Sequence, residues 1–193
     1  MLKKHINIFI AVFCFSLFSC TEIDYKESKD GYDVYRILKG ANGVPREAQS
    51  LDGSSLRFDI KFDSTAMYYG NQGLPHLNKV FGFNDCGSDE FIDANSTRLG
   101  WRWYNGRLEL FALTISGNVG DTVKLQDIYI GQNYLCQIDI IDSLYRYSID
   151  GKQLANTHRG CLSTDSQKRI LNPYFGNDTI VAQHEMVFYI KRY

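Results

Sequence analysis

The chain has 193 residues, 44% of them hydrophobic and 14% aromatic, which excludes a disordered chain and is enough for one domain with a sizeable core. Its 21 basic and 22 acidic side chains give a net charge of -1, so it lacks the basic character of nucleic-acid-binding proteins. We therefore expect no nucleic-acid partner.

The N-terminal residues have the pattern of an export signal. Lys3 and Lys4 precede an almost unbroken apolar stretch over residues 8–18, which is short for a permanent membrane span. The stretch ends in Leu17-Phe18-Ser19-Cys20, which resembles a bacterial lipobox. A plain secretory signal or a short anchor helix is the alternative.

The lipobox resemblance implies that residues 1–19 are a lipoprotein signal peptide and that Cys20 is lipidated. Several acyl chains on one residue anchor a protein stably. The polar residues 20–31 then form a tether, and residues 32–193 form a single folded domain. We expect a lipid-anchored protein of the cell envelope at the outer membrane, on its periplasmic or its surface face.

Of the five cysteines, Cys14 leaves with the signal peptide and Cys20 carries the lipid, so Cys86, Cys136 and Cys161 remain and allow one disulfide at most. Cys136 is at an apolar position of an alternating segment, where a buried free thiol is the expected state. The pairing of Cys86 with Cys161 is possible in an exporting compartment, but it is not the outcome that we expect.

Alternation of apolar and polar residues dominates the rest of the chain, and no convincing amphipathic helix is present. About ten strands separated by turn signals are typical of a sandwich or a barrel. We predict an all-β jelly-roll β-sandwich with few or no helices. The expected strands are residues 34–38, 56–62, 79–83, 123–130 and 170–175, hairpins over 99–114 and 134–149, and a last strand over 184–193.

Asn105-Gly106 is the best turn signal, because both residues tolerate the positive φ angles of a type I′ turn. A two-residue turn there pairs Arg102 with Glu109 and gives the hairpin two faces. The predicted core face carries Leu99, Trp101, Trp103, Leu108 and Leu110. The opposite face, which is either a solvated surface or a ligand-binding face, carries Arg98, Arg102, Tyr104, Arg107 and Glu109.

Three segments form a set: NKVFGFND at 78–85, NSTRLGWRW at 95–103 and NPYFG at 172–176. They resemble the motifs of a family of small secreted proteins and lipoproteins from polysaccharide-using Gram-negative bacteria. The match covers most of residues 55–190. The family often has a histidine between the first two segments, and this chain has none there.

A looser likeness rests on residues 145–152, where a strand leads into Asp-Gly-Lys, and on residues 96–102, 137–139 and 173–176. The first segment is similar to LamG-type modules, and the others follow the order of the three motifs of family 7 alginate lyases. This likeness implies a concanavalin-like or lectin-like jelly roll that takes a sugar polymer on a concave sheet face. Asp139 stands where the lyase motif has a histidine, which argues against lyase activity.

The candidate ligand face therefore consists of Arg98, Arg102, Tyr104, Arg107, Glu109 and Gln137. A lyase needs a base and a group that neutralises the uronate carboxylate. If the protein is a lyase, Tyr104, Arg98 and His184 are the candidate catalytic residues.

Other site chemistries have weaker support. The chain lacks the paired carboxylates of retaining glucanases on one strand, and it lacks zinc-ligand spacing. Asp85, Asp89, Glu90 and Asp93 are a weak calcium candidate whose spacing does not match an EF-hand loop. Apart from this possible structural calcium, we expect no cofactor.

We therefore expect a membrane-anchored lipoprotein that is a non-catalytic glycan-binding or accessory protein. The alternative is a polysaccharide lyase-like enzyme that cleaves an acidic glycan by β-elimination. The expected partners are the membrane, through the lipid anchor, and either a polysaccharide or an outer-membrane protein complex.

Overall fold

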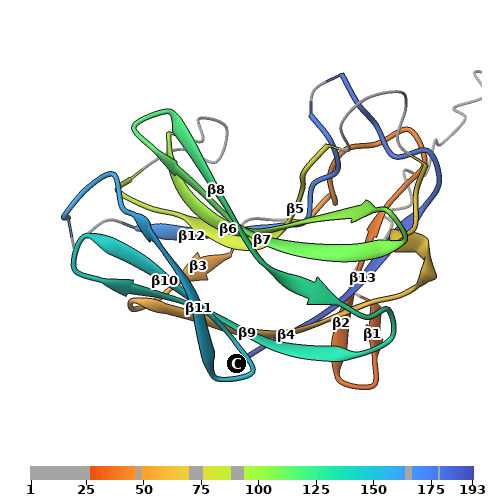
Figure 1. Cartoon of the computed structure of the whole chain (residues 1–193), viewed down its shortest axis with the longest axis horizontal. Coiled ribbons are helices and arrows are strands. Elements are labelled where there is room, and N and C mark those ends of the chain that lie inside the picture. Colours follow the sequence, from red (N-terminus) through yellow and green to blue (C-terminus); the bar gives the residue numbers. More distant parts are fainter. Residues whose placement is uncertain (1–26, 47–48, 70–75, 88–93, 164–166, 178) are drawn as a thin grey trace, which may run out of the picture.

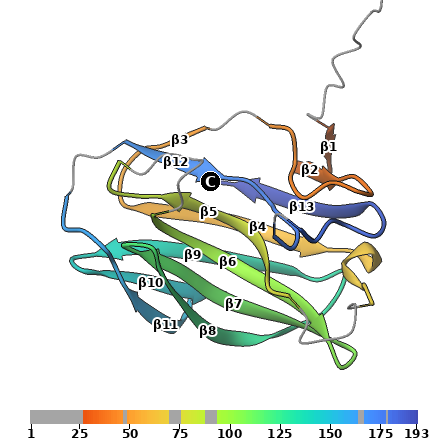
Figure 2. The ribbon, with the colours of Figure 1, turned by 90° about the horizontal axis from the view of Figure 1, so that it is seen from above.

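The computed structural model describes residues 27–46, 49–69, 76–87, 94–163, 167–177 and 179–193. They form two antiparallel β-sheets packed face to face (Figure 1). One sheet has seven strands in the order β1-β2-β13-β4-β9-β10-β11, and the other has six in the order β3-β12-β5-β6-β7-β8. Seen from above, central strands of both sheets, such as β4 and β9 of one and β6 and β7 of the other, run roughly along the long axis of the molecule, as in an aligned sandwich (Figure 2).

The strands of the seven-stranded sheet are β1 (Glu27–Lys29), β2 (Tyr32–Ile37), β13 (Met186–Arg192), β4 (Ser55–Phe62), β9 (Asn133–Ile141), β10 (Leu144–Ile149) and β11 (Lys152–His158). Those of the six-stranded sheet are β3 (Ser50–Leu51), β12 (Lys168–Leu171), β5 (Asn78–Asn84), β6 (Asn95–Tyr104), β7 (Arg107–Ser116) and β8 (Val119–Ile128). In the described ranges the only helical element is a short 3-10 turn, η1 (Ser64–Ala66), and no helix there is long and apolar enough to cross a membrane.

The all-β prediction is confirmed, with differences at strand ends and with β3 and β11 absent from the expected strands. The predicted strand 170–175 is shorter than expected, because β12 ends at Leu171 and Pro173 has no N–H for a sheet ladder. β1 lies inside segment 20–31, which was expected to be a tether. Asp30 and Gly31 both have positive φ angles, which turn the chain so that β1 pairs with β2.

The β6–β7 hairpin has the predicted register. Arg102 pairs with Glu109 and Trp101 with Leu110, and the φ angles of Asn105 and Gly106 are 50° and 73°. Trp101 and Leu110 are completely buried, so the face predicted to be core does face the other sheet.

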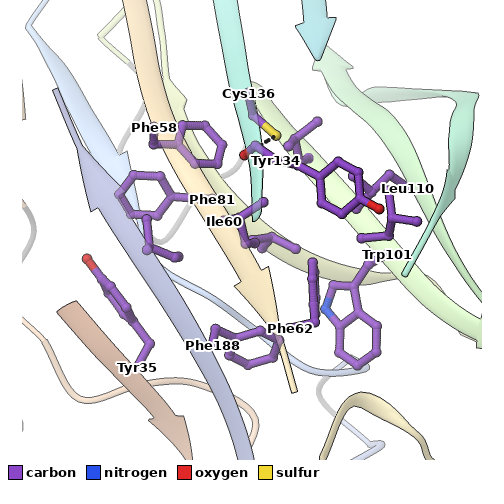
Figure 3. Packing of buried hydrophobic residues seen from close by; sticks show 14 of the residues in the cluster. Tyr35, Phe58, Ile60, Phe62, Phe81, Trp101, Leu110, Tyr134, Cys136 and Phe188 are labelled. Atoms are coloured by element: carbon purple, nitrogen blue, oxygen red, sulfur yellow. Dashed lines mark hydrogen bonds between the residues drawn. The ribbon is translucent and has the colours of Figure 1, made fainter. Parts of the chain in front are cut away.

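Aromatic side chains fill the space between the sheets (Figure 3). The ring centre of Trp101 on β6 lies 5.5 Å from that of Phe62 on β4 and 5.7 Å from that of Phe188 on β13. The cluster therefore joins the two sheets. Cys136 lies in the same core as a buried free thiol, as predicted.

Candidate functional site

The outer face of the six-stranded sheet collects charged and aromatic side chains. Because paired residues of antiparallel strands share a face, the register places Lys79, Gly100, Phe111 and Lys124 in one row across β5 to β8. Tyr174, which follows β12, extends this row through a bridge to Lys79. The Lys79 Nζ atom lies 5.2 Å from the centre of the Tyr174 ring, within cation–π range.

The neighbouring row is a network of ion pairs. Arg102 Nε donates to Glu109 Oε2 at 2.5 Å, and Lys124 Nζ donates to Glu109 Oε1 at 2.5 Å. Asp127 lies 2.7 Å from Lys124 and accepts from Arg107 at 3.3 Å. Two carboxylates thus hold three cationic side chains on this surface.

Glu109 is the anion at the centre of the network, and only 7% of its surface is exposed. Burial raises the pKa of its carboxyl, but the hydrogen bonds from Lys124 and Arg102 outweigh burial and hold the pKa below its ordinary value. Glu109 is therefore ionised at neutral pH. It positions two cations and is unsuited to protonate a leaving group.

Arg102 is also held by aromatic rings, since its guanidinium lies 5.0 Å from the centre of the Tyr104 ring and 4.9 Å from that of Phe111. Arg98 lies on the same face of β6, paired with Leu113. The name "basic face" is used below for the outer surface formed by Lys79, Arg98, Arg102, Tyr104, Arg107, Glu109, Phe111, Lys124, Asp127 and Tyr174.

Most of the predicted ligand face lies together on the basic face, but Gln137 does not. Gln137 is on β9 of the other sheet, where it pairs with Arg57 and donates to Asp139. Its neighbours Cys136 and Ile138 face the core, so the Gln137 side chain lies on the opposite outer surface of the sandwich. Adjacent motifs in the lyase order therefore fall on different sheets here.

His184 is also separate from Arg98 and Tyr104. It precedes β13 of the seven-stranded sheet, and its Nε2 atom lies 2.8 Å from the carbonyl oxygen of Thr65 in η1. Sheet pairing therefore does not assemble the predicted catalytic set.

Sequence reasoning missed Lys79, Phe111 and Lys124 as members of the basic face. Lys79 and Tyr174 were inside two of the segments that form the sequence motif set. Only the bridge between residues 79 and 174 shows that these segments lie side by side.

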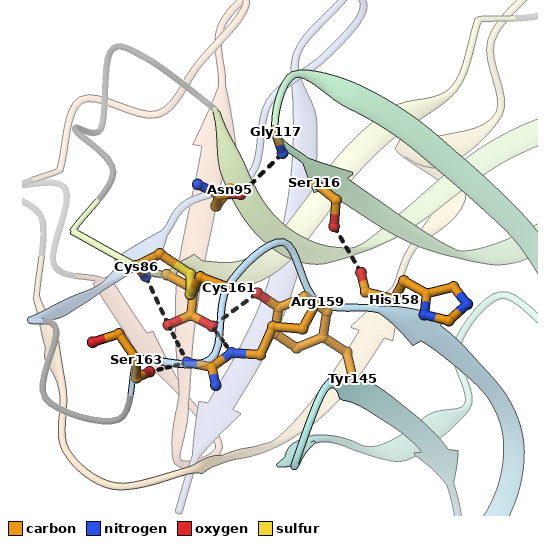
Figure 4. The surroundings of a disulfide bond; sticks show 10 residues. Cys86, Asn95, Ser116, Gly117, Tyr145, His158, Arg159, Cys161 and Ser163 are labelled. Carbon is orange, nitrogen blue, oxygen red and sulfur yellow. Dashed lines mark hydrogen bonds and ion pairs between the residues drawn. A yellow bond between two sulfur atoms is a disulfide. The ribbon is translucent and has the colours of Figure 1, made fainter.

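Asp85, the first residue of the calcium candidate, has protein partners instead (Figure 4). Its carboxylate accepts hydrogen bonds from Arg159 Nε at 2.5 Å, from Arg159 Nη2 at 3.0 Å and from Tyr145 Oη at 2.8 Å. The backbone N–H of Cys86 donates to the same carboxylate at 2.8 Å. Both oxygens are engaged in a completely buried position, so Asp85 is not available to a cation. Asp89, Glu90 and Asp93 lie outside the described residues.

Cys86 and Cys161 form a disulfide, contrary to the expectation from the sequence (Figure 4). Cys86 follows β5 and Cys161 follows β11, so the bond links the two sheets. The two cysteines are 75 residues apart, and no local pattern relates them. They lie close together because the two sheets pack face to face.

A pocket of about 480 Å³ opens beside the tip of the β6–β7 hairpin, where β8 ends. It is lined by Trp103, Arg107, Asp127, Ile128, Tyr129 and Ile130, among others, and is called the hairpin pocket below. Trp103 is half-buried and packs against the core, whereas 72% of Tyr129 is exposed.

No protein-family model and no curated protein sequence matches the chain. Solved structures do. The alginate lyase Aly36B mutant in complex with alginate trisaccharide is 20% identical, with a TM-score of 0.55 over 85% of this chain and 80% of that one. The alginate lyase AlyC3 is 11% identical, with a TM-score of 0.58 over 84% and 74%. The laminarinase catalytic domain of Thermotoga maritima is 12% identical, with a TM-score of 0.52 over 87% and 78%.

These identities establish a shared fold and no more. The chain is an all-β sandwich with the jelly-roll architecture of these polysaccharide lyases and glycoside hydrolases. The concanavalin-like fold implied by the sequence is therefore confirmed, whereas the specific motif family is not among these matches.

Proposed function

We propose that this protein binds an acidic polysaccharide on the basic face without cleaving it. The observation that carries the proposal is the composition of that face. In a chain of net charge -1, five cationic and two anionic side chains gather on one sheet surface, together with the rings of Tyr104 and Tyr174. Carboxylates of a uronate polymer pair with such cations, and sugar rings pack on aromatic faces.

The state of Glu109 supports binding rather than hydrolysis. A glycosidase needs one protonated and one ionised carboxyl group on either side of the bond that is cut. Glu109 is ionised and already accepts from Arg102 and Lys124. Jelly-roll neighbours with bound alginate trisaccharide and dimannuronate support the choice of an acidic glycan as ligand.

The test is retardation of the full chain, in detergent, in gels containing alginate, with a neutral glucan as the reference polymer. We expect retardation by alginate that falls as salt rises, because the attraction is screened. Arg102→Gln and Lys124→Gln each remove one cation and should weaken binding by about three- to tenfold.

Arg57→Gln is the matched control, since Arg57 lies on β4 in the other sheet and pairs with Gln137 on its outer surface. It should bind alginate like the wild type. Equal affinity of the Arg102 and Lys124 variants and the wild type would contradict the proposal. Absence of binding to any polysaccharide would also contradict the proposal and would favour a protein partner in an outer-membrane complex.

A lyase is the second candidate, favoured by the Tyr104 phenol beside the Arg102 guanidinium on the basic face. In β-elimination a tyrosine base removes the C5 proton of the uronate while a cation stabilises the charge that develops on its carboxylate. The C4–O glycosidic bond then breaks as the C4–C5 double bond forms, and the departing oxygen takes a proton. The unsaturated product absorbs in the ultraviolet. Absorbance that rises with alginate and is abolished in Tyr104→Phe, while retardation persists, would establish this candidate.

Anchoring to the membrane through a lipid on Cys20 is part of the proposal and rests on the lipobox resemblance, because Cys20 lies outside the described residues. Such an anchor would hold the glycan-binding domain at the cell envelope. Cys20→Ser should move the protein from the membrane fraction to the soluble fraction.

A further inference from the structure

The hairpin pocket adjoins the basic face at Arg107 and Asp127, and its aromatic lining sets it apart from that face. Trp103 alternates with Arg102 and Tyr104 along β6, so its side chain lies on the opposite side of that strand. Tyr129 follows β8 and stands at the mouth of the pocket with most of its ring exposed. We propose that the hairpin pocket binds one pyranose ring of a neutral sugar chain.

The aromatic pair supplies the apolar part of the site. Trp103 and Tyr129 both line the pocket and present ring surface on which the C–H faces of a sugar can pack. The backbone at Tyr129 is held in place, because its N–H donates to Tyr134 Oη at 2.9 Å and that hydroxyl donates to Gln132 Oε1 at 3.0 Å. The exposed ring therefore projects from a fixed point of the chain.

The polar part of the site is the ion pair between Arg107 and Asp127, which also lines the pocket. The side chains are exposed, at 70% for Arg107 and 37% for Asp127. Arginine donates hydrogen bonds and aspartate accepts them, so the pair suits adjacent sugar hydroxyls, each of which is both donor and acceptor. Both residues also belong to the basic face, and Asp127 pairs with Lys124 at 2.7 Å as well. The uncharged rings of Trp103 and Tyr129 are therefore what make the pocket suit a neutral sugar.

The size of the pocket fits this ligand. About 480 Å³ is within the range of small-molecule sites and leaves room for a ring and the start of its neighbours. This inference rests on the proposed function for the class of ligand, but it assigns an adjoining site and a different sugar. A glycan of mixed composition would then meet the domain at two places.

The two tryptophans make the test specific, since Trp101 is completely buried and Trp103 lines the pocket. Tryptophan fluorescence of the full chain would be titrated with cellohexaose, laminarihexaose and mannohexaose, in a detergent without a sugar headgroup. We expect a saturable change with at least one of them, and no change in Trp103→Phe, which keeps only the buried indole.

Tyr129→Ala keeps Trp103 as the fluorescent reporter. It should weaken the binding of the hexaose that the wild type binds about tenfold, which corresponds to the loss of one aromatic contact. Tyr193→Ala is the matched control, because Tyr193 is 62% exposed at the end of the other sheet. It should bind like the wild type. Urea unfolding midpoints of all variants would show that each is folded.

Two results would overturn the inference: no saturable change with any hexaose up to about 10 mM, or equal affinity in Tyr129→Ala and the wild type. Alginate retardation is measured separately on the same variants. Loss of alginate binding alone therefore contradicts only the proposed function, and loss of hexaose binding alone contradicts only the pocket.

Discussion

Single polar residues decide how the two sheets meet. Tyr145 and Tyr147 on β10 are completely buried and reach from the seven-stranded to the six-stranded sheet. Tyr145 Oη donates to Asp85, and Tyr147 Oη shares hydrogen bonds with Thr97 and Thr114 at 2.5 Å and 2.9 Å. A buried hydroxyl left without a partner costs about 1–3 kcal/mol, so these bonds favour one arrangement of the sheets.

The ion pair of Asp85 and Arg159 makes a prediction about stability and pH. Burial raises the pKa of the Asp85 carboxyl, but hydrogen bonds from Arg159, Tyr145 and the Cys86 N–H outweigh it, so the pKa lies below its ordinary value. The ionised carboxylate therefore stabilises the fold above the ordinary pKa of 3.8, and this contribution is lost as pH falls through the lower, folded value.

Asp85→Asn should lower the free energy of unfolding by about 3 kcal/mol or more at neutral pH, because Arg159 would remain buried without its counter-charge. Urea unfolding at pH 7 and at about pH 3 would measure this change. The difference in the free energy of unfolding between variant and wild type should be smaller at the lower pH. Asp52→Asn, at an exposed loop residue, is the control. A gap of the same size at both pH values would contradict the linkage.

At the scale of elements, a bulge in β5 sets which β5 residues lie beside the β6 residues of the basic face. The register between β5 and β6 shifts between Lys79 and Gly82, which leaves Lys79 opposite Gly100 and Gly82 opposite Arg98. Gly82 has no room for a side chain, since a Cβ there would lie 2.0 Å from the Thr97 carbonyl oxygen and 2.5 Å from the Arg98 Cα. Both atoms are backbone of β6 and have little freedom to move.

Gly82→Ala should therefore destabilise the protein by about 2 kcal/mol or more. Gly120→Ala on β8 is the matched control, because no atom lies within 4 Å of a Cβ at that position. It should change the free energy of unfolding by less than about 0.5 kcal/mol. The urea unfolding midpoints of the two variants provide the comparison. Equal midpoints would contradict the prediction and would mean that the β6 backbone moves to accommodate the added methyl group.

At the scale of the whole molecule, hydrophobic packing and covalent chemistry both join the sheets. Trp101, Phe62 and Phe188 pack between them, while the Cys86–Cys161 bond joins the chain after β5 to the chain after β11. The disulfide closes a loop of 75 residues, which limits the freedom of the unfolded chain. The Asp85–Arg159 ion pair joins the same two segments through their side chains.

Replacing both cysteines, Cys86→Ser with Cys161→Ser, should lower the free energy of unfolding by about 4 kcal/mol on the loop-entropy model. Reductant should bring the urea midpoint of the wild type down toward that of the double variant, whose own midpoint should not respond. A wild type that is insensitive to reductant, although peptide mapping shows its disulfide reduced, would refute this prediction.

The amino-acid sequence by itself determined most of the strands, the Asn105-Gly106 turn and the pairing of Arg102 with Glu109. Pleat alternation and turn chemistry act over a few residues, so a pattern in one segment contains them. The same reasoning placed Cys136 in the core.

Only the tertiary structure decided which strand belongs to which sheet. That assignment brought Tyr174 to Lys79, put Gln137 on the opposite surface, and joined Asp85 to Arg159 across 74 residues. Contacts between distant segments depend on how two whole sheets pack. The alternation of apolar and polar residues along a strand shows which side chains face inward, but it does not show which strands are neighbours.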